Sequence, residues 1–168
     1  NVLYITLEMA EERIAERIDA NLLDVTIDDL YEMPKEIYDN KTQKLQNKIN
    51  GHLIIKEYPT AAAHAGHFKS LMDELALKKS FKPDIVFIDY LNICSSSRFK
   101  GGNISSYFYV KAIAEELRGL AVQYNVPIVS ATQTTRSGYL SSDVGLEDTS
   151  ESFGLPATAD SVSYTHLT

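Results

Sequence analysis

Apolar and polar positions along this chain follow two patterns, short apolar runs and longer stretches with helical spacing. Four runs are short enough to be buried strands, at residues 2–7, 53–58, 84–88 and 127–131. Stretches whose apolar residues recur every three or four positions lie between or beside them, at residues 9–23, 34–50, 67–79 and 110–124. Since strands that alternate with helices form parallel sheets covered on both faces, the pattern predicts an α/β fold with a mainly parallel sheet.

Two helices and two loops are predicted in more detail. Residues 110–124 carry a continuous apolar stripe, and residues 9–23 carry a narrower one formed by Ile14, Ile18 and Leu22. Residues 95–106 are rich in glycine and serine, and residues 132–150 form a long polar stretch without periodicity. A loop as long as residues 132–150 inside a compact domain is usually functional or mobile.

Composition narrows the class of protein. A chain of 168 residues is long enough for one domain with a real core. The net charge of −7 excludes a wholly basic nucleic-acid binder but leaves room for a few cations on binding loops. The one cysteine, Cys94, excludes an internal disulfide and fits a reducing cytoplasm. No apolar run approaches the roughly 18 residues of a membrane span, so we expect no membrane association.

Three of the four predicted strands end next to a polar side chain. Run 2–7 is followed by Glu8, run 84–88 by Asp89, and run 127–131 by Thr132 and Gln133. The carboxyl ends of parallel strands lie along one edge of a sheet, where ligands bind. We therefore expect two acids and an amide to meet at this edge, a combination suited to metal-nucleotide chemistry.

Each of these residues has a chemical and a structural interpretation. Asp89 can hold Mg²⁺ through its water shell beside a triphosphate, or can be a turn residue after a strand. Glu8 can polarise the water that attacks the terminal phosphate, or can be a first-turn glutamate favoured by the helix macrodipole. Gln133 can hydrogen-bond a phosphate oxygen, or can be an exposed loop residue. The residues alone leave both interpretations open.

Basic residues, histidines and the cysteine give weaker signals. Arg136 can serve phosphate or nucleic acid, with a solvated arginine as the alternative. The same two interpretations apply to a sparse basic group made of Arg98, Lys100 and Lys111. His64 and His67 have ligand-like spacing, but no cysteine or nearby carboxylate completes a zinc set, so we interpret them as surface residues. Cys94 has no identifiable base and is expected to be a small buried side chain.

Taken together, three segments resemble the motifs of the DnaB-like replicative helicases. Residues 6–9 (TLEM) resemble that family's S-L-E-M motif, and residues 85–91 (IVFIDYL) resemble its Walker B strand with the D-Y-L ending. Residues 130–136 (SATQTTR) resemble its S-Q-x-x-R sensor segment. The resemblance covers nearly all of residues 1–160 and is closest to the replicative helicases of tailed bacteriophages. Further similar segments are residues 1–5, 17–21, 111–118 and 154–160.

The resemblance implies a RecA-like P-loop NTPase domain that assembles as a homo-hexamer, hydrolyses ATP with Mg²⁺ and moves 5′ to 3′ along single-stranded DNA. On the matching positions, Glu8 would be the catalytic base, Asp89 the magnesium and nucleotide-binding acid, and Gln133 the γ-phosphate sensor. The family also implies primase and a helicase loader as partners, and the host bacterial cytoplasm as location if the protein is phage-encoded.

The resemblance also implies a DNA-binding role for the basic residues on two loops. The loops at residues 95–103 and 134–151 would lie nearest the channel that holds the DNA. Arg98 and Lys100 would contact DNA from the first loop, and Arg136 would contact DNA or nucleotide from the second. Such contacts would be made mainly to the backbone and would weaken with salt.

The chain departs from the family pattern in two ways. It contains no G-x-x-x-x-G-K-[ST] phosphate-binding motif, and the family's arginine finger would lie beyond Asp160. We therefore expect residues 1–160 to be part of a longer RecA-like domain, and the isolated chain not to hydrolyse ATP. Residues 161–168 resemble a translated sequencing adapter and are expected to be a non-native tail. Two alternatives stay open, a RecA/RadA-type recombination ATPase and a module that assembles or binds DNA without hydrolysis.

Overall fold

The computed structural model describes residues 1–99, 104–133 and 155–163. Four strands form one sheet in the order β2–β1–β3–β4, and every neighbouring pair is parallel. The strands are β1 (Val2–Thr6), β2 (Leu53–Glu57), β3 (Ile85–Asp89) and β4 (Ile128–Ser130). All four predicted strands are therefore present, and the prediction of a parallel sheet is confirmed.

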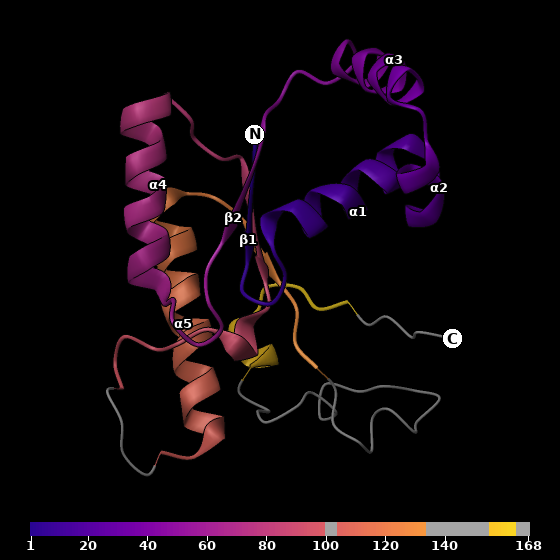
Figure 1. Ribbon diagram of the computed structural model, residues 1–168. Coiled ribbons are helices and arrows are strands. Elements are labelled where there is room, and N and C mark those ends of the chain that lie inside the picture. Colours follow the sequence, from indigo (N-terminus) through magenta and orange to yellow (C-terminus); the bar gives the residue numbers. More distant parts are fainter. Residues whose placement is uncertain (100–103, 134–154, 164–168) are drawn as a thin grey trace.

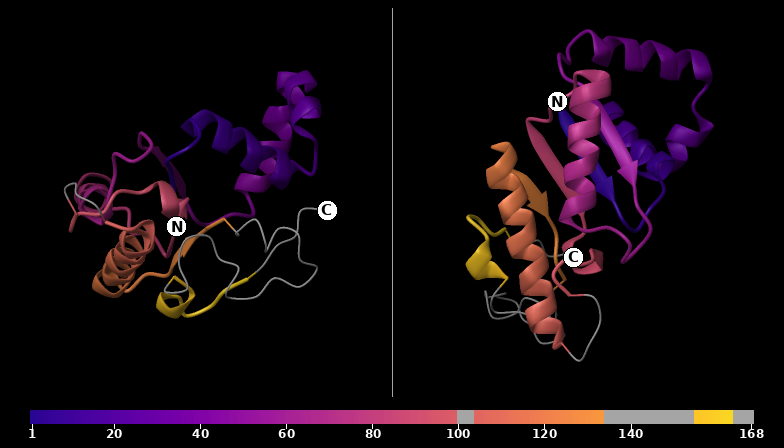
Figure 2. Two further views of the ribbon diagram at one scale, coloured as in Figure 1. Left: turned by 90° about the horizontal axis from the view of Figure 1, so that it is seen from below. Right: turned by 90° about the vertical axis from the view of Figure 1, so that its left-hand side faces the viewer.

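Helices cover both faces of this sheet, as Figure 1 shows. On one face lie α4 (Ala65–Lys79) and α5 (Ser106–Tyr124), which Figure 2 shows side by side. On the other face lies α1 (Glu11–Leu23), followed by α2 (Ile27–Glu32) and α3 (Lys35–Gln46), which extend away from the sheet. Two short 3-10 turns complete the described elements, η1 (Leu91–Ile93) and η3 (Pro156–Thr158).

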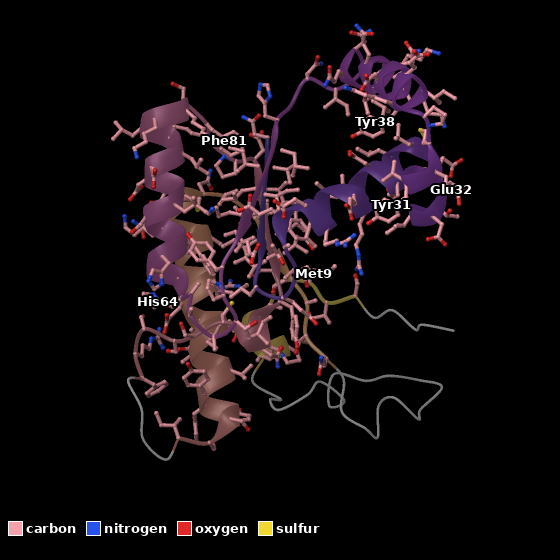
Figure 3. The ribbon with its side chains drawn as sticks, viewed as in Figure 1. Met9, Tyr31, Glu32, Tyr38, His64 and Phe81 are labelled. Atoms are coloured by element: carbon pink, nitrogen blue, oxygen red, sulfur yellow. The ribbon has the colours of Figure 1, made fainter. Side chains whose placement is uncertain are left out.

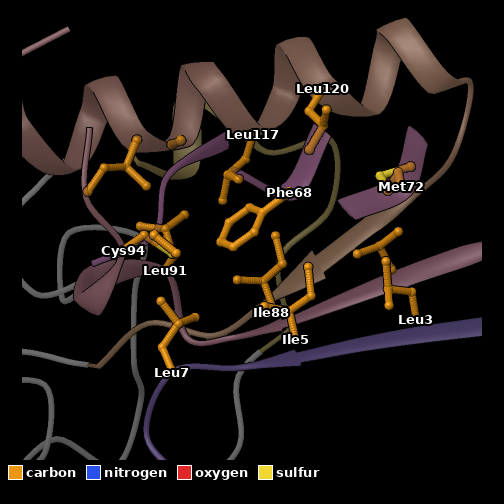
Figure 4. Close-up of a cluster of buried hydrophobic side chains, with 14 of the residues drawn as sticks. Leu3, Ile5, Leu7, Phe68, Met72, Ile88, Leu91, Cys94, Leu117 and Leu120 are labelled. Atoms are coloured by element: carbon orange, nitrogen blue, oxygen red, sulfur yellow. The ribbon is translucent and has the colours of Figure 1, made fainter. Parts of the chain in front are cut away.

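The apolar core fills the space between the sheet and the α4–α5 pair. Alternate side chains of β1 and β3 point into it, and each is at most 1% exposed. Phe68 of α4 is completely buried among them (Figure 4). Residues of the two strands and of α5 that join this cluster are Leu3, Ile5, Val86, Ile88, Val110, Ile113, Ala114, Leu117 and Leu120.

The intervening side chains of β1 and β3 face α1. Here α1 buries Ile14, Ala20 and Leu23, so its inward face differs from the predicted one. Leu22 of the predicted stripe is 47% exposed, because the helix is turned so that Leu23 points inward instead. The position of the helix was correct, but a four-residue repeat alone did not give its rotation about the axis.

Helix boundaries differ from the sequence predictions where side chains bind the backbone. α1 begins at Glu11 rather than Met9, because the Thr6 hydroxyl accepts from Met9 N at 3.1 Å and donates to Met9 O at 2.9 Å. α4 begins at Ala65, two residues early, because His64 caps it: Gly66 N donates to His64 Nδ1 at 3.0 Å. α3 ends at Gln46, short of the predicted residue 50, and α5 begins four residues before Val110.

That residues 161–168 are a non-native tail stays a prediction. Residues 161–163 are exposed and belong to no helix or strand, and residues 164–168 lie outside the described part. Just before them, Arg118 of α5 donates to Thr158 O at 2.8 Å and pairs with Asp160 at 2.9 Å. Two segments of the predicted family likeness, 111–118 and 154–160, are thus in contact.

Candidate active site at the carboxyl edge of the sheet

Strand pairing brings the ends of β1, β3 and β4 together. Thr6 lies opposite Asp89, and Ile88 lies opposite Ser130. The pairing continues past the strands, because Leu7 N donates to Asp89 O at 2.9 Å and Leu91 N donates to Ala131 O at 3.3 Å. The segments that carry Glu8, Asp89 and Gln133 therefore leave the sheet side by side at one edge, as the sequence predicts.

Glu8 lies in the tight connection between β1 and α1. The buried Thr6 hydroxyl closes this connection through its two bonds to Met9, and Thr60 Oγ1 donates to Leu7 O at 2.6 Å. Figure 3 shows Met9, the next residue, at the lower end of the sheet. Glu8 itself is exposed, and its carboxylate makes no hydrogen bond or ion pair with any described residue. Hydrogen bonds thus hold the backbone around Glu8, while its carboxylate is open to solvent.

Asp89 is the last residue of β3 and is half-buried. Its carboxylate accepts a hydrogen bond at Oδ2 from the Tyr4 hydroxyl, 3.0 Å away. Burial, followed by this hydrogen bond, raises the pKa of Tyr4 to about 12. Sequence reasoning missed Tyr4, because the contact depends on the register of β1 against β3, which places Tyr4 opposite Phe87.

Gln133 lies three residues beyond β4, and its side chain is tied to the segment after β3. Its Nε2 donates to the hydroxyl of Tyr90 at 3.2 Å, and Tyr90 is the residue after Asp89. Next to it, Thr132 Oγ1 donates to Asn92 Oδ1 at 2.8 Å. These bonds join the two segments outside the sheet. Tyr90 and Asn92 were not singled out from sequence either.

Comparison with known proteins identifies the family. Residues 1–166 match the family described as the DnaB-like helicase C terminal domain. The chain belongs to this family. The match also favours the DnaB-like helicases over the RecA/RadA-type recombination ATPases that the sequence left open.

Individual relatives support the assignment. The chain is 50% identical over 163 residues to the DnaB-like replicative helicase of Enterobacteria phage T4, covering 95% of this chain and 34% of that protein. It is 28% identical over 137 residues to a probable plasmid replicative DNA helicase of Chlamydia psittaci, covering 79% of this chain and 28% of that protein. The chain thus spans about a third of the length of these relatives.

Solved structures show the same fold. A DnaB-like replicative helicase studied with its primase interactions has a TM-score of 0.73 at 20% identity, covering 95% of this chain and 38% of that one. A second solved structure, of an isolated ATPase domain, has a TM-score of 0.74 at 20% identity, covering 95% and 56%. The four-stranded parallel sheet and its helices therefore have the RecA-like architecture of DnaB ATPase domains, as predicted.

Within this DnaB-like domain, the structure describes only one of the three predicted DNA-binding residues, Arg98. Lys100 and Arg136 lie outside the described residues, as does the loop 134–151. Arg98 is half-exposed and pairs with Glu115 at 2.5 Å, and its Nε lies 4.0 Å from Glu116. Lys111 also lies 4.0 Å from Glu115. These acids offset the positive charge, so a DNA role for Arg98 requires it to exchange partners.

Glu116 of α5 holds the start of the same loop. Its carboxylate accepts from the hydroxyls of Ser96 at 2.6 Å and Ser97 at 2.8 Å, and from Ser97 N at 3.0 Å. The pKa of Glu116 lies below its usual value: burial acts to raise it, but these hydrogen bonds outweigh burial. An open depression beside the loop is lined by Phe99, Phe108 and Lys111 among others. Glu116 therefore holds the start of this loop against α5.

Asp89 fits the Mg²⁺ role that the DnaB-like family implies. Its Oδ1 has no partner among the described residues, while Oδ2 is held by Tyr4. Mg²⁺ usually keeps several waters and takes one or two carboxylates plus substrate phosphates, so a single acid at this edge is sufficient. Elsewhere in the described residues, no group of three or more histidines, cysteines or acids is placed to hold a metal ion.

The remaining candidates have structural roles. His64, which Figure 3 shows at the start of α4, accepts at its ring from Gly66 N, and its backbone N–H donates to His67 Nδ1 at 3.2 Å, so this pair caps a helix. Cys94 is 3% exposed, and burial raises the pKa of its thiol to about 12. The prediction of a small buried side chain is confirmed. Among the helices described, none has the length and hydrophobicity that crossing a bilayer demands.

Proposed function

We propose that this chain is part of the ATPase motor of a replicative DNA helicase. The longer protein would hydrolyse ATP, move 5′ to 3′ along single-stranded DNA and unwind duplex DNA as a homo-hexamer. One observation carries the proposal: a domain of the DnaB-like family brings an uncommitted glutamate, a half-buried aspartate and a tethered glutamine to one sheet edge.

Each residue has a distinct role in this proposal. Glu8 is the general base, because its exposed carboxylate is free to accept a proton from the attacking water. Asp89 binds the Mg²⁺–nucleotide complex through the oxygen that Tyr4 leaves open. Gln133 senses the γ-phosphate, because its amide has donors for a phosphate oxygen and already contacts Tyr90 beside Asp89. Bound Mg²⁺ would neutralise charge that develops during phosphoryl transfer.

The DNA-binding role is proposed for Arg98, Lys100 and Arg136. Arg98 supports it by its place on an anchored loop at the surface, beside a depression that the exposed Phe108 also lines. Contacts of this kind are electrostatic, so affinity for single-stranded DNA should fall steeply with salt. By family likeness, we further propose primase and a helicase loader as partners, and the cytoplasm as the compartment, that of the bacterial host if the protein is phage-encoded.

The decisive experiment replaces the proposed base in the full-length protein that carries this chain. Glu8→Gln removes the proton acceptor and keeps the size of the side chain, so turnover of ATP should fall by about 10²- to 10⁴-fold. Nucleotide binding should be retained. Glu12→Gln is the matched control, because Glu12 is an exposed glutamate four residues away on α1 and should leave turnover unchanged.

The outcomes separate the helicase motor from a module without hydrolysis. Turnover by the wild-type protein that disappears in Glu8→Gln supports the motor. Wild-type turnover in Glu8→Gln removes Glu8 from the site, and absence of any turnover in the full-length protein supports the non-hydrolysing module. The isolated 168-residue chain is expected to be inactive, since it contains no phosphate-binding motif.

A further inference from the structure

Tyr4 is the side chain in direct contact with the proposed magnesium carboxylate. It lies on β1 opposite Phe87 of β3, two residues before the Thr6–Asp89 pair. Neighbours on one face of a sheet reach each other diagonally when one of them is long. The Tyr4 phenol spans this diagonal, and its hydroxyl donates to Asp89 Oδ2 at 3.0 Å.

The rest of the Tyr4 side chain is held independently of this hydrogen bond. Its ring stacks on Phe87 with centroids 6.0 Å apart and planes 21° from parallel. Tyr4 lies on the face of the sheet that α1 covers, and it is half-buried there. Packing therefore holds the ring that carries this hydroxyl.

We propose that Tyr4 is a positioning residue for Asp89: by holding Oδ2, it directs Oδ1 towards the Mg²⁺–nucleotide complex. This inference rests on the proposed role of Asp89. A hydrogen bond to an ionised carboxylate is stronger than a neutral one, so it can determine the orientation of the group. Removing such an outer partner of a metal ligand typically costs 10- to 100-fold in metal affinity or activity.

Tyr4→Phe isolates this role, because it keeps the stacked ring and removes the hydroxyl alone. The chain offers a matched control in Tyr38, whose hydroxyl donates to Asp19 Oδ2 at 2.6 Å in the α1–α3 region. Figure 3 shows Tyr38 on α3, away from the sheet edge. Tyr38→Phe therefore removes a bond of the same type at a place away from the proposed nucleotide site.

The experiment measures binding rather than turnover. The full-length protein is titrated with Mg²⁺ in the presence of a fluorescent, non-hydrolysable ATP analogue, and melting temperatures are recorded in parallel. In Tyr4→Phe, the Mg²⁺ concentration for half-maximal binding should rise about tenfold. Binding of the analogue in EDTA and the melting temperature should stay as in the wild type. Tyr38→Phe should match the wild type in Mg²⁺ dependence.

Asp89→Asn and the double variant complete the test. If Tyr4 acts through Asp89, Tyr4→Phe should add nothing to the defect of Asp89→Asn. A normal Mg²⁺ dependence in Tyr4→Phe beside a defective Asp89→Asn overturns this inference and leaves the proposed function standing. Normal behaviour of Asp89→Asn overturns the proposed role of Asp89 itself. A shift shared by Tyr4→Phe and Tyr38→Phe, or a loss of folding in Tyr4→Phe, shows a merely structural role.

Discussion

The two helical layers that flank the sheet are stabilised in different ways. The α4–α5 layer buries nine side chains of its own, and all but Ala112 join the strands in one continuous apolar cluster. In the α1–α3 layer, α1 buries three side chains, and α2 and α3 bury none. Four large apolar residues of these three helices are 36–55% exposed: Leu22, Ile27, Tyr31 and Ile37.

Polar contacts replace apolar burial in the α1–α3 layer. Thr26 and Asp29 form a capping box at the start of α2, and Tyr38 of α3 donates to Asp19 of α1. Such contacts contribute about 1 kcal/mol each, far less than a buried aromatic side chain. Segments with few buried contacts open first. We therefore expect α2 and α3 to open locally while the α4–α5 layer unfolds only with the whole domain.

The largest effect is expected in the α4–α5 layer. Phe68→Ala should lower the free energy of unfolding by about 3–5 kcal/mol, because it leaves a cavity at a completely buried position. Urea unfolding of the domain measures this change. A loss below about 1 kcal/mol would mean that the core collapses into the cavity or that this layer is not the main source of stability.

Variants of Glu116 test whether a polar contact also stabilises the α4–α5 layer. Glu116→Ala should cost about 1–3 kcal/mol, because the donors of Ser96 and Ser97 lose their partner where the Glu116 side chain is only 7% exposed. Glu115→Ala, at a neighbouring side chain that is 40% exposed, should cost less than about 1 kcal/mol. Equal losses of unfolding free energy in the two variants would contradict the role of Glu116 as the anchor of the loop.

The pH dependence of the Glu116 anchor has a defined sign. Its pKa is lower in the folded protein than the ordinary 4.5, so the unfolded chain binds the proton first. The stabilisation is therefore complete above about pH 4.5 and is lost as the pH falls through the folded pKa. Glu116→Gln should remove this part of the acid dependence, which unfolding curves at several pH values measure.

A smaller and local effect is expected for the α2 cap. Thr26→Ala should cost about 1 kcal/mol, because Asp29 N loses its acceptor at 3.1 Å and the capping box opens. Hydrogen exchange should accelerate in α2 and not in α4 or α5. Thr26→Ser keeps the hydroxyl and should restore most of the protection. Faster exchange throughout the sheet would show that the two layers are more strongly coupled than we propose.

The smallest effect is expected at the surface of α3. Ile37 is 49% exposed, so Ile37→Ser should change the free energy of unfolding by no more than about 0.5 kcal/mol. The same urea unfolding experiment that is used for Phe68→Ala measures it. A loss above about 1 kcal/mol would mean that α3 is packed more tightly than its exposure indicates.

The sequence predicted the elements and the edge where they end, but not the contacts that hold the edge. Runs of apolar residues were enough for the four strands, because buried parallel strands need little else. The partners Tyr4 of Asp89 and Tyr90 of Gln133 depend on strand register and loop path, which no local pattern contains. The start of α4 was missed because a histidine, an uncommon cap, replaces the usual serine or aspartate there.

The bond between Gln133 and Tyr90 has one more consequence. A glutamine amide carries two N–H groups, and one of them is already occupied by the Tyr90 hydroxyl. If Gln133 reads a terminal phosphate, it starts from a defined resting position and not from a freely rotating one. Moving between two acceptors exchanges one hydrogen bond for another, so the side chain needs little energy to change position and returns to a ready acceptor once the phosphate has left.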